Sequence, residues 1–302
     1  MRAGTDRFRL LTGGIGLVAP TALILIVAVL FQQALPAIRH FGFGFLTGRV
    51  WNPVTLHFSA LPYIYGTLVT SAIALLIAVP IGIGVALFLA DPGQPRIRGP
   101  IGIGVELLAA IPSVVYGLWA LFVMGPFVFK SVETPISDRF GNFALFAGPA
   151  RSTSYFTAGL ILAIMVLPTL ASVSRDVIRA VPGGLRESSV ALGATWWETT
   201  WQVILPAARA GIFGATILAL GRALGETIAV TMVIGNRFQI SPSLFEPGYS
   251  LAAVIANEFT EATAPLHTAS LVELGLVLIG VTLTVNLVAL GLLRATHQRG
   301  AG

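Results

Sequence analysis

The sequence has no cysteine and few charged residues, and each shortage excludes a class of protein. Without cysteine, the chain can form no disulfide framework, no thiolate metal site and no cysteine nucleophile. Charged residues make up only 10% of the 302 residues, whereas an average soluble domain has roughly 25%. Hydrophobic residues make up 55%. This composition is typical of an integral membrane protein.

Motifs for nucleotide hydrolysis and for catalysis are also missing from the sequence. There is no Gly-x4-Gly-Lys-Ser/Thr phosphate loop, so we expect no ATPase site in this chain. The histidines are dispersed over expected loops and helix ends, which favours solvated or interfacial roles over metal binding: His40, His57, His267 and His297. We therefore expect no catalytic residue, no metal site and no cofactor in this chain.

Six apolar segments are long enough to cross a lipid bilayer. They cover about residues 14–34, 62–90, 101–126, 155–181, 207–235 and 267–293, and the longer loops between them cover 35–61, 127–154 and 236–266. The first segment has the position of a signal peptide. Its apolar run is longer than a signal h-region and no small-residue cleavage site follows, so we interpret it as a retained transmembrane helix. The sequence predicts an all-α, polytopic membrane protein.

The basic residues predict the orientation of these spans. If the N-terminus is cytoplasmic, the cytoplasmic segments carry Arg2, Arg7, Arg9, Arg96, Arg98, Arg175, Arg179, Arg186, Arg209, Arg294 and Arg299. The external segments then carry the smaller set of Arg39, Arg49, Lys130, Arg139, Arg151 and Arg237. The excess places both termini in the cytoplasm. Because these arginines are scattered and form no basic run, the net charge of +5 indicates membrane topology rather than nucleic-acid binding.

Arg222 and Glu226 are charges inside an apolar run that extends from Arg209 to Arg237. At ~1.5 Å per helical residue, Arg222 lies close to the bilayer midplane. A charge at this depth is costly unless it is paired or faces water, so it is a functional candidate. The spacing of four residues places Arg222 and Glu226 on one helical face, where they can neutralise each other. The alternative is a static ion pair that only holds helices together.

Other residues of the spans have structural interpretations. Gly221 and Gly225 form a pair of small residues that allows close approach of another helix. Glu106 and Glu273 are expected to be interfacial carboxylates or helix-packing hydrogen-bond partners rather than ion-handling groups. Pro112 is expected to kink the third span, because proline removes a backbone donor and clashes with the preceding turn.

The polar segment after the fourth span has a composition unlike the rest of the chain. Pro182-Gly183-Gly184 ends that span, and residues 185–202 then mix charges and small residues with Trp196, Trp197 and Trp201. Tryptophans beside charges are typical of a short helix that lies along a membrane surface. An ordinary amphipathic connector has the same composition.

The spacing in this segment resembles the coupling motif of ABC importer permeases, Glu-Ala-Ala-x3-Gly-x9-Ile-x-Leu-Pro. Here the matching residues are Glu187, Ser188, Ser189, Gly193, Val203, Leu205 and Pro206. Serines replace both alanines and valine replaces isoleucine, which keeps small side chains where a partner must pack closely. A short helix–turn–helix of this kind suits docking into a groove of a soluble protein. In the family, that groove belongs to a nucleotide-binding ATPase subunit.

Two further strings resemble the phosphate-specific branch of this family. Residues 106–117 (ELLAAIPSVVYG) are similar to its third-span signature, and residues 221–227 (GRALGET), with 234–236 (IGN), are similar to its fifth-span signature. Trp51-Asn52-Pro53, Tyr65-Gly66-Thr67 and the ANEF string at 256–259 favour the C-type of the two phosphate permeases over its A-type sister. Together these resemblances extend over most of residues 51–294.

The resemblance implies a fold, a set of domains and an assembly. The fold is that of a type I ABC importer permease, with six transmembrane helices and a short cytoplasmic coupling helix between the fourth and fifth. The expected divisions are a tail at 1–13, a first helix with its external loop at 14–61, a permease domain at 62–294 with the coupling segment at 185–206, and a tail at 295–302. The partners are a sister permease, two ATPase subunits that bind ATP and Mg, and a periplasmic or lipid-anchored phosphate-binding protein, in a bacterial plasma (inner) membrane.

The predicted function is that of the subunit through which inorganic phosphate passes, with Arg222 and Glu226 on the pathway. Arg222 presents a fixed positive charge to the anion, and Glu226 offsets that charge when no phosphate is present. Permeases for sulfate, molybdate or phosphonate are alternatives within the family. A proton-coupled secondary anion transporter is an alternative from another class, although no inverted repeat is evident. A membrane scaffold or sensor would not require a charge pair at the midplane.

Overall fold

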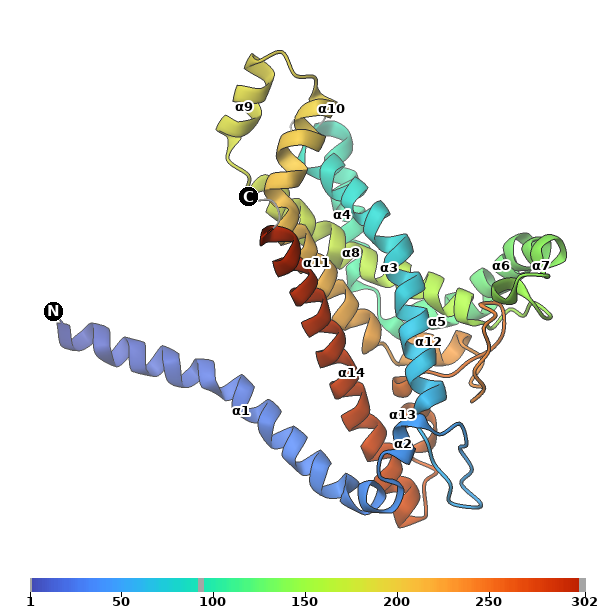
Figure 1. Ribbon diagram of the computed structural model, residues 1–302. Coiled ribbons are helices and arrows are strands. Elements are labelled where there is room, and N and C mark those ends of the chain that lie inside the picture. Colours follow the sequence, from blue (N-terminus) through green and yellow to red (C-terminus); the bar gives the residue numbers. More distant parts are fainter. Residues whose placement is uncertain (1, 92–94, 299–302) are drawn as a thin grey trace.

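The computed structural model describes residues 2–91 and 95–298, and these residues are almost entirely helical (Figure 1). The α-helices are α1 Arg2–Phe41, α2 Gly44–Thr47, α3 Leu61–Ala90, α4 Pro95–Ala110, α5 Ser113–Trp119, α6 Gly125–Val128, α7 Thr134–Phe140, α8 Tyr155–Arg179, α9 Gly183–Ala191, α10 Trp196–Thr199, α11 Leu205–Leu224, α12 Ile228–Val233, α13 Leu251–Glu258 and α14 Pro265–Gln298. Short π-helical or 3₁₀ segments lie at Ala120–Met124, Phe129–Glu133, Ala144–Phe146 and Thr200–Ile204. Within the described ranges, the only β pairing is an isolated bridge between Asn52 and His57.

Six helical stretches are long and apolar enough to cross a membrane, which confirms the predicted all-α, six-span architecture. They are Thr12–Phe41, Leu61–Ala90, Ser113–Phe140, Tyr155–Arg179, Trp196–Leu224 and Pro265–Gly291. The second, fourth and sixth agree closely with the predicted segments. The third and fifth have different bounds from the predicted segments, because a helix ends inside each predicted segment although the sequence stays apolar there.

Helix α8 forms the centre of the bundle because it buries side chains around most of its surface. It packs along α3 and also contacts α11, α12 and α4. Small residues allow these close approaches: a Cβ atom on Gly159 would lie 2.5 Å from the side chain of Ile73 of α3, and one on Gly211 of α11 would overlap the side chain of Val177. Large apolar side chains such as Ile161 and Leu170 fill the space between. The core of the molecule therefore lies along α8.

The predicted third span at 101–126, with a kink at Pro112, is wrong in its bounds. Helix α4 ends at Ala110, and Pro112 adopts an extended conformation (φ −60°, ψ 143°) as the residue that precedes α5. Proline lacks an N–H group and forces the residue before it away from helical angles, so the chain breaks here instead of bending. The helical path then continues to Phe140, because Pro126 and Pro135 each stand at the first or second residue of a new helical segment, where proline is tolerated. The predicted loop at 127–154 is therefore largely helical in its first half.

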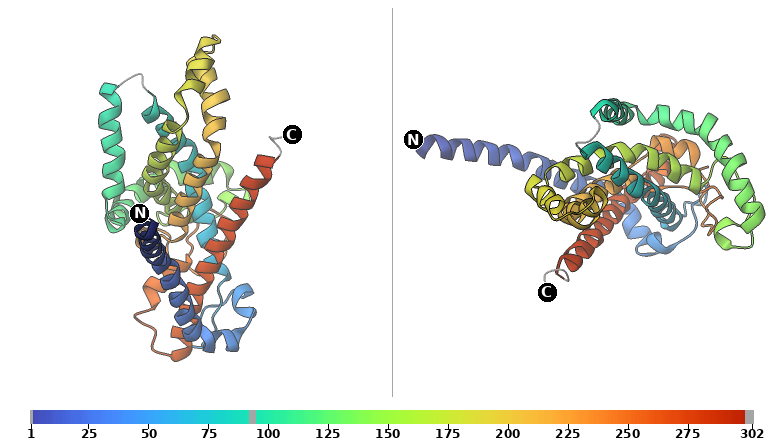
Figure 2. Two further views of the ribbon diagram at one scale, coloured as in Figure 1. Left: turned by 90° about the vertical axis from the view of Figure 1, so that its left-hand side faces the viewer. Right: turned by 90° about the horizontal axis from the view of Figure 1, so that it is seen from above.

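Helix α1 stands apart from the rest of the bundle. Its N-terminal end diverges from the other helices (Figure 1 and the right-hand view of Figure 2), and the apolar window of its span contains no buried residue. Near its other end, α1 packs on α14, and a cavity of about 720 Å³ opens between α1, α3 and α14. Glu273 lies in the wall of this cavity, buried, and its Oε2 atom has no hydrogen-bond partner. Most of α1 is thus free to contact lipid or another subunit.

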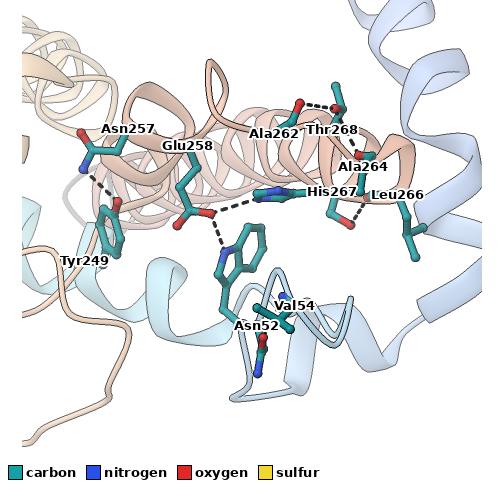
Figure 3. A network of polar contacts seen from close by, with 12 residues as sticks. Asn52, Val54, Tyr249, Asn257, Glu258, Ala262, Ala264, Leu266, His267 and Thr268 are labelled. Carbon is teal, nitrogen blue, oxygen red and sulfur yellow. Dashed lines mark hydrogen bonds and ion pairs between the residues drawn. The ribbon is translucent and has the colours of Figure 1, made fainter.

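A polar network ties the loops together (Figure 3), at the end of the bundle opposite α9 (Figure 1). Glu258, at the end of α13, accepts a hydrogen bond from the Trp51 indole at 2.7 Å, and its Oε2 lies 3.1 Å from Nε2 of His267 at the start of α14. The ring of His267 stacks on Phe58. The carboxylate of Glu258 thus joins the start of α14 to a loop about 200 residues earlier in the chain, so the predicted loops at 35–61 and 236–266 are ordered parts of the fold.

Candidate functional site

Arg222 lies in the last turn of α11, next to a break in the fifth span. The predicted continuous helix over 207–235 is wrong: α11 ends at Leu224, Gly225 closes it, and α12 begins only at Ile228. Glycine is costly inside a helix and favoured where one ends, which makes Gly225 the natural stop. Interrupted helices at membrane depth are found where the backbone lines a cavity, and they commonly mark binding sites in transporters.

The break overturns the predicted ion pair between Arg222 and Glu226. Because the backbone leaves the helical path after Leu224, the two side chains do not lie on one helical face, and no ion pair joins them within the described part of the chain. The Oε1 atom of Glu226 instead accepts a hydrogen bond of 3.4 Å from the N–H group of Ala229, in the first turn of α12. The Glu226 carboxylate therefore accepts a bond at the start of α12 and forms no ion pair that would neutralise Arg222.

Arg222 faces a cavity of about 390 Å³ formed by three helices. Its Nη1 atom lies 3.4 Å from the hydroxyl of Thr169 on α8, and Asn286 on α14 lies in the same wall. The Oδ1 atom of Asn286 has no hydrogen-bond partner. An arginine, a hydroxyl and a primary amide line the cavity, and the described residues place no carboxylate within ion-pair distance of the guanidinium. Such a set favours an anion.

Gly221 contributes open space to this cavity. A Cβ atom placed on Gly221 would meet no atom within 4 Å, and Gly221 lies in the wall beside Arg222. The predicted helix approach at Gly221 and Gly225 is therefore not made by another helix of the described chain. The small residue instead keeps the space in front of the guanidinium open.

The polar segment after α8 forms the predicted helix–turn–helix, and it projects beyond the end of the spans (Figure 1). Gly193 has φ of +90°, a conformation that side chains rarely adopt, so this position requires glycine. The following turn is fixed by a capping box, in which Thr195 and Glu198 bond to each other's backbone N–H groups. The hydroxyls of Ser189 and Thr199 lie 3.0 Å apart and join the two arms.

This helix–turn–helix exposes the residues that the sequence singled out. Glu187, Ser188 and Gly193 are exposed, Ser189 is half-buried, and α9 buries no residue. At the turn, Leu192 is 89% exposed, so its apolar side chain is available to another surface. Leu205 and Pro206 are the first residues of α11. Trp196, Trp197 and Trp201 are also exposed beside the turn.

One helix connects the two candidate sites. The turn leads through α10 and the π-helical segment into α11, whose other end carries Arg222. From Leu205 to Arg222 the helix spans about 26 Å at 1.5 Å per residue. A rigid element of this kind can carry a displacement of the exposed turn to the cavity around Arg222.

Sequence reasoning found Arg222 and the exposed turn but missed Thr169 and Asn286. These two residues join the cavity only through packing of α8 and α14 against α11. Asn286 carried a usable signal, because a primary amide in a strongly apolar span is costly unless it has a polar role. Thr169 carried none, since threonine is readily accommodated in membrane helices by bonding to its own backbone.

Comparisons with known proteins agree with this architecture. A family described as binding-protein-dependent transport system inner membrane component matches residues 78–300. The chain is 50% identical to "Phosphate transport system permease protein PstC" of Mesorhizobium japonicum over 86% of its own length and 81% of the relative's. It is 47% identical to the protein of the same name from Pasteurella multocida, over 81% and 78% of the two chains.

A solved structure with the same fold is a chain of the MetNI methionine ABC transporter in an inward-facing conformation. The TM-score is 0.58 at 18% sequence identity, and the match covers 77% of this chain and 94% of that chain. At this identity the likeness concerns the fold alone.

Proposed function

The chain belongs to the family of binding-protein-dependent transport system inner membrane components, and we propose a function for it within that family. It forms the pathway for inorganic phosphate in an ATP-driven importer. The observation that carries the proposal is the cavity in which Arg222 meets Thr169 and Asn286 without a carboxylate partner. The relatives that match most of the chain are phosphate transport system permeases by name. Both observations indicate an oxyanion as the substrate.

The cavity offers phosphate complementary groups. The guanidinium of Arg222 can donate two parallel hydrogen bonds to phosphate oxygens, and the Thr169 hydroxyl can donate a third. The unpartnered Oδ1 of Asn286 can accept the proton of a P–OH group. At neutral pH phosphate still carries such a proton and sulfate does not, so this acceptor favours phosphate over sulfate.

Arg222 carries a charge that the protein itself does not balance at this depth, so an anion entering the cavity gains attraction that replaces part of its lost hydration. A site on a transport path must bind strongly enough for entry and weakly enough for release. Glu226, four residues along the chain in the break, belongs to the same pathway in this proposal. Its negative charge limits how tightly the anion is held near Arg222.

The exposed turn around Gly193 couples the pathway to ATP hydrolysis in partner subunits. Glu187, Ser188, Ser189 and Gly193 enter a groove on a nucleotide-binding ATPase subunit, and Leu205 and Pro206 begin the helix that transmits the movement. The exposure of Leu192 and the small residues of α9 support this docking. ATP and Mg are bound by the ATPase partners, and the assembly also includes a sister permease and a phosphate-binding protein outside the membrane.

In this arrangement the end of the bundle that carries α9 faces the cytoplasm, as do both termini, in a bacterial plasma (inner) membrane. The excess of basic residues in the segments at that end supports this orientation.

Reconstitution tests the proposed function. The complex of this chain with its ATPase and sister subunits, placed in proteoliposomes with the binding protein, should accumulate labelled phosphate only when ATP is present at the ATPase face, and vanadate should stop it. Uptake that continues without ATP and is abolished by a proton uncoupler would contradict the proposal and identify a secondary transporter. ATP-driven uptake of sulfate or molybdate in place of phosphate would show that the substrate is wrong.

A further inference from the structure

A second cavity, of about 320 Å³, lies between α4 and α8 at the end of the bundle that carries α9. Three arginines line it: Arg98 near the start of α4, and Arg175 and Arg179 near the end of α8. Among the described residues of its wall, Glu106 is the one acid. This cavity shares no described residue with the one that contains Arg222. Helix α4 stands at the margin of the bundle (Figure 2).

The arginines of this cavity carry more charge than the neighbouring carboxylates neutralise. Arg175 lies 3.5 Å from Glu106 and 3.2 Å from Asp176, so its charge is balanced. Arg179 donates from Nη2 to the carbonyl oxygen of Leu89 at 2.8 Å, which is a neutral acceptor. Within the described part of the chain, Arg98 takes part in no ion pair. Two guanidinium groups therefore lack a carboxylate partner in a cavity that can hold a small anion.

The shape of the cavity also leaves room for a small anion between the arginines. On the α4 side, a Cβ atom at Gly99 would meet no atom within 4 Å, and one at Gly102 would meet only Leu89, at 3.8 Å. The absence of side chains at these positions leaves room between the guanidinium groups. On α4, Ile103 in the cavity wall is 60% exposed, and Ile97, one residue before Arg98, is 51% exposed. An apolar surface beside a basic cavity is the combination that a phospholipid, with a charged headgroup and acyl chains, can cover.

We propose that this cavity between α4 and α8 binds a phosphate group, with Arg98 and Arg179 as its ligands. Arginine is suited to this because its planar fork donates paired hydrogen bonds to phosphate oxygens. In the proposed orientation the cavity lies at the cytoplasmic face. The group is supplied there either by the headgroup of an anionic phospholipid or by free inorganic phosphate. The site does not depend on the role of Arg222.

Binding to the purified complex of this chain with its partner subunits tests the inference. Native mass spectrometry in detergent measures retention of phosphatidylglycerol against phosphatidylcholine. Equilibrium dialysis in lipid-free detergent measures binding of labelled inorganic phosphate, in a background of Arg222→Ala that removes the pathway site. For whichever of the two ligands occupies the cavity, the double variant Arg98→Gln/Arg179→Gln should weaken binding about tenfold or more, because it removes charge-assisted hydrogen bonds. Arg96→Gln is the matched control, since Arg96 is exposed at the start of α4 but does not line the cavity.

A variant that should raise the affinity for the bound group distinguishes a role in binding from a structural role. Glu106→Gln removes the negative charge of the cavity and should raise the affinity for the bound group several-fold, which loss of packing cannot do. Loss of phosphatidylglycerol alone in the double variant identifies a lipid site, and loss of inorganic phosphate alone identifies a site for the free anion. If the double variant binds both ligands as tightly as the Arg96→Gln control, or if Glu106→Gln lowers the affinity, the inference is overturned.

Discussion

At the scale of single residues, the chain separates a cation from the carboxylate nearest to it in sequence. Arg222 faces a cavity with Thr169, while Glu226 bonds to the backbone of Ala229 on the other side of the helix break. An ion pair buried in the membrane is costly to open, and an anion would have to displace the carboxylate to reach the arginine. The separation removes that obstacle and leaves the guanidinium available to a substrate.

Asn286→Leu should weaken phosphate transport and reduce its selectivity. The substitution keeps the volume of the side chain but removes the free acceptor in the cavity wall. Loss of one neutral hydrogen bond, about 1 kcal/mol, corresponds to a several-fold higher KM for phosphate uptake. Sulfate should become a better competitor of phosphate uptake at the same time.

Thr284→Val on the same helix is the control for Asn286, because Thr284 faces the cavity between α1 and α14. Equal phosphate KM values and equal sulfate competition in the two variants would remove Asn286 from the site.

Glu226→Gln should change transport without preventing folding. The neutral amide can still accept the bond from Ala229, so α12 keeps its start. Without the negative charge, the anion near Arg222 is held more tightly, and both the KM and the maximal rate of phosphate uptake should fall by a few-fold. Glu261→Gln, at an exposed loop carboxylate, should leave both values unchanged. Unaltered kinetics in Glu226→Gln would count against a place for this residue on the pathway.

At the scale of elements, α11 continues directly from the helix–turn–helix before it. The turn at Gly193 is exposed and conformationally fixed, and the far end of α11 carries Arg222. A displacement at the turn can reach the cavity through the continuous helical stretch Trp196–Leu224. Each part has a separate physical requirement: glycine at the turn, small and exposed side chains on α9, and a helix stop at Gly225.

Gly193→Trp should release the ATPase subunits or uncouple them from transport. Gly193 has φ of +90°, so any side chain strains the turn, and an indole also occupies the space that a partner surface must fill. The spans lie outside the turn, so membrane insertion should be unaffected. The measurements are co-purification of the ATPase subunits and the ratio of phosphate transported to ATP hydrolysed. Glu187→Arg should act in the same direction through reversal of an exposed charge.

Gly184→Ala is the control for the turn. A Cβ atom there also meets no atom within 4 Å, and φ does not lie in the left-handed region. If Gly193→Trp retains its ATPase subunits and couples as tightly as Gly184→Ala, the turn is not the docking element.

Hydropathy in the sequence was sufficient to predict six spans, because burial in lipid requires long apolar runs and little else resembles them. The two breaks were not predicted, since the apolar character continues across Pro112 and Gly225 while the backbone direction changes. Proline and glycine at these positions were the available signals. The turn at Gly193 was predicted correctly because its motif depends on local spacing, whereas the cavity that joins Thr169, Arg222 and Asn286 depends on the packing of three distant helices.

At the scale of the whole molecule, the chain is built to be part of a larger assembly. Helix α8 is buried on most sides, whereas α1 exposes its apolar surface and α9 its polar surface. The apolar surface of α1 is unfavourable in water, so lipid or another subunit must cover it, whereas the polar surface of α9 is free to contact a soluble partner.

Labelled phosphate uptake by the reconstituted complex with Arg222→Ala tests whether Arg222 lies on the phosphate pathway. Loss of the charge-assisted contacts to the anion should lower the rate about tenfold or more, while the assembled complex and its binding of ATPase subunits remain intact. Arg139→Gln, an exposed arginine on α7 remote from the cavity, should transport at the wild-type rate. ATP-dependent phosphate uptake by Arg222→Ala at the rate of Arg139→Gln would contradict the assignment of Arg222 to the phosphate pathway.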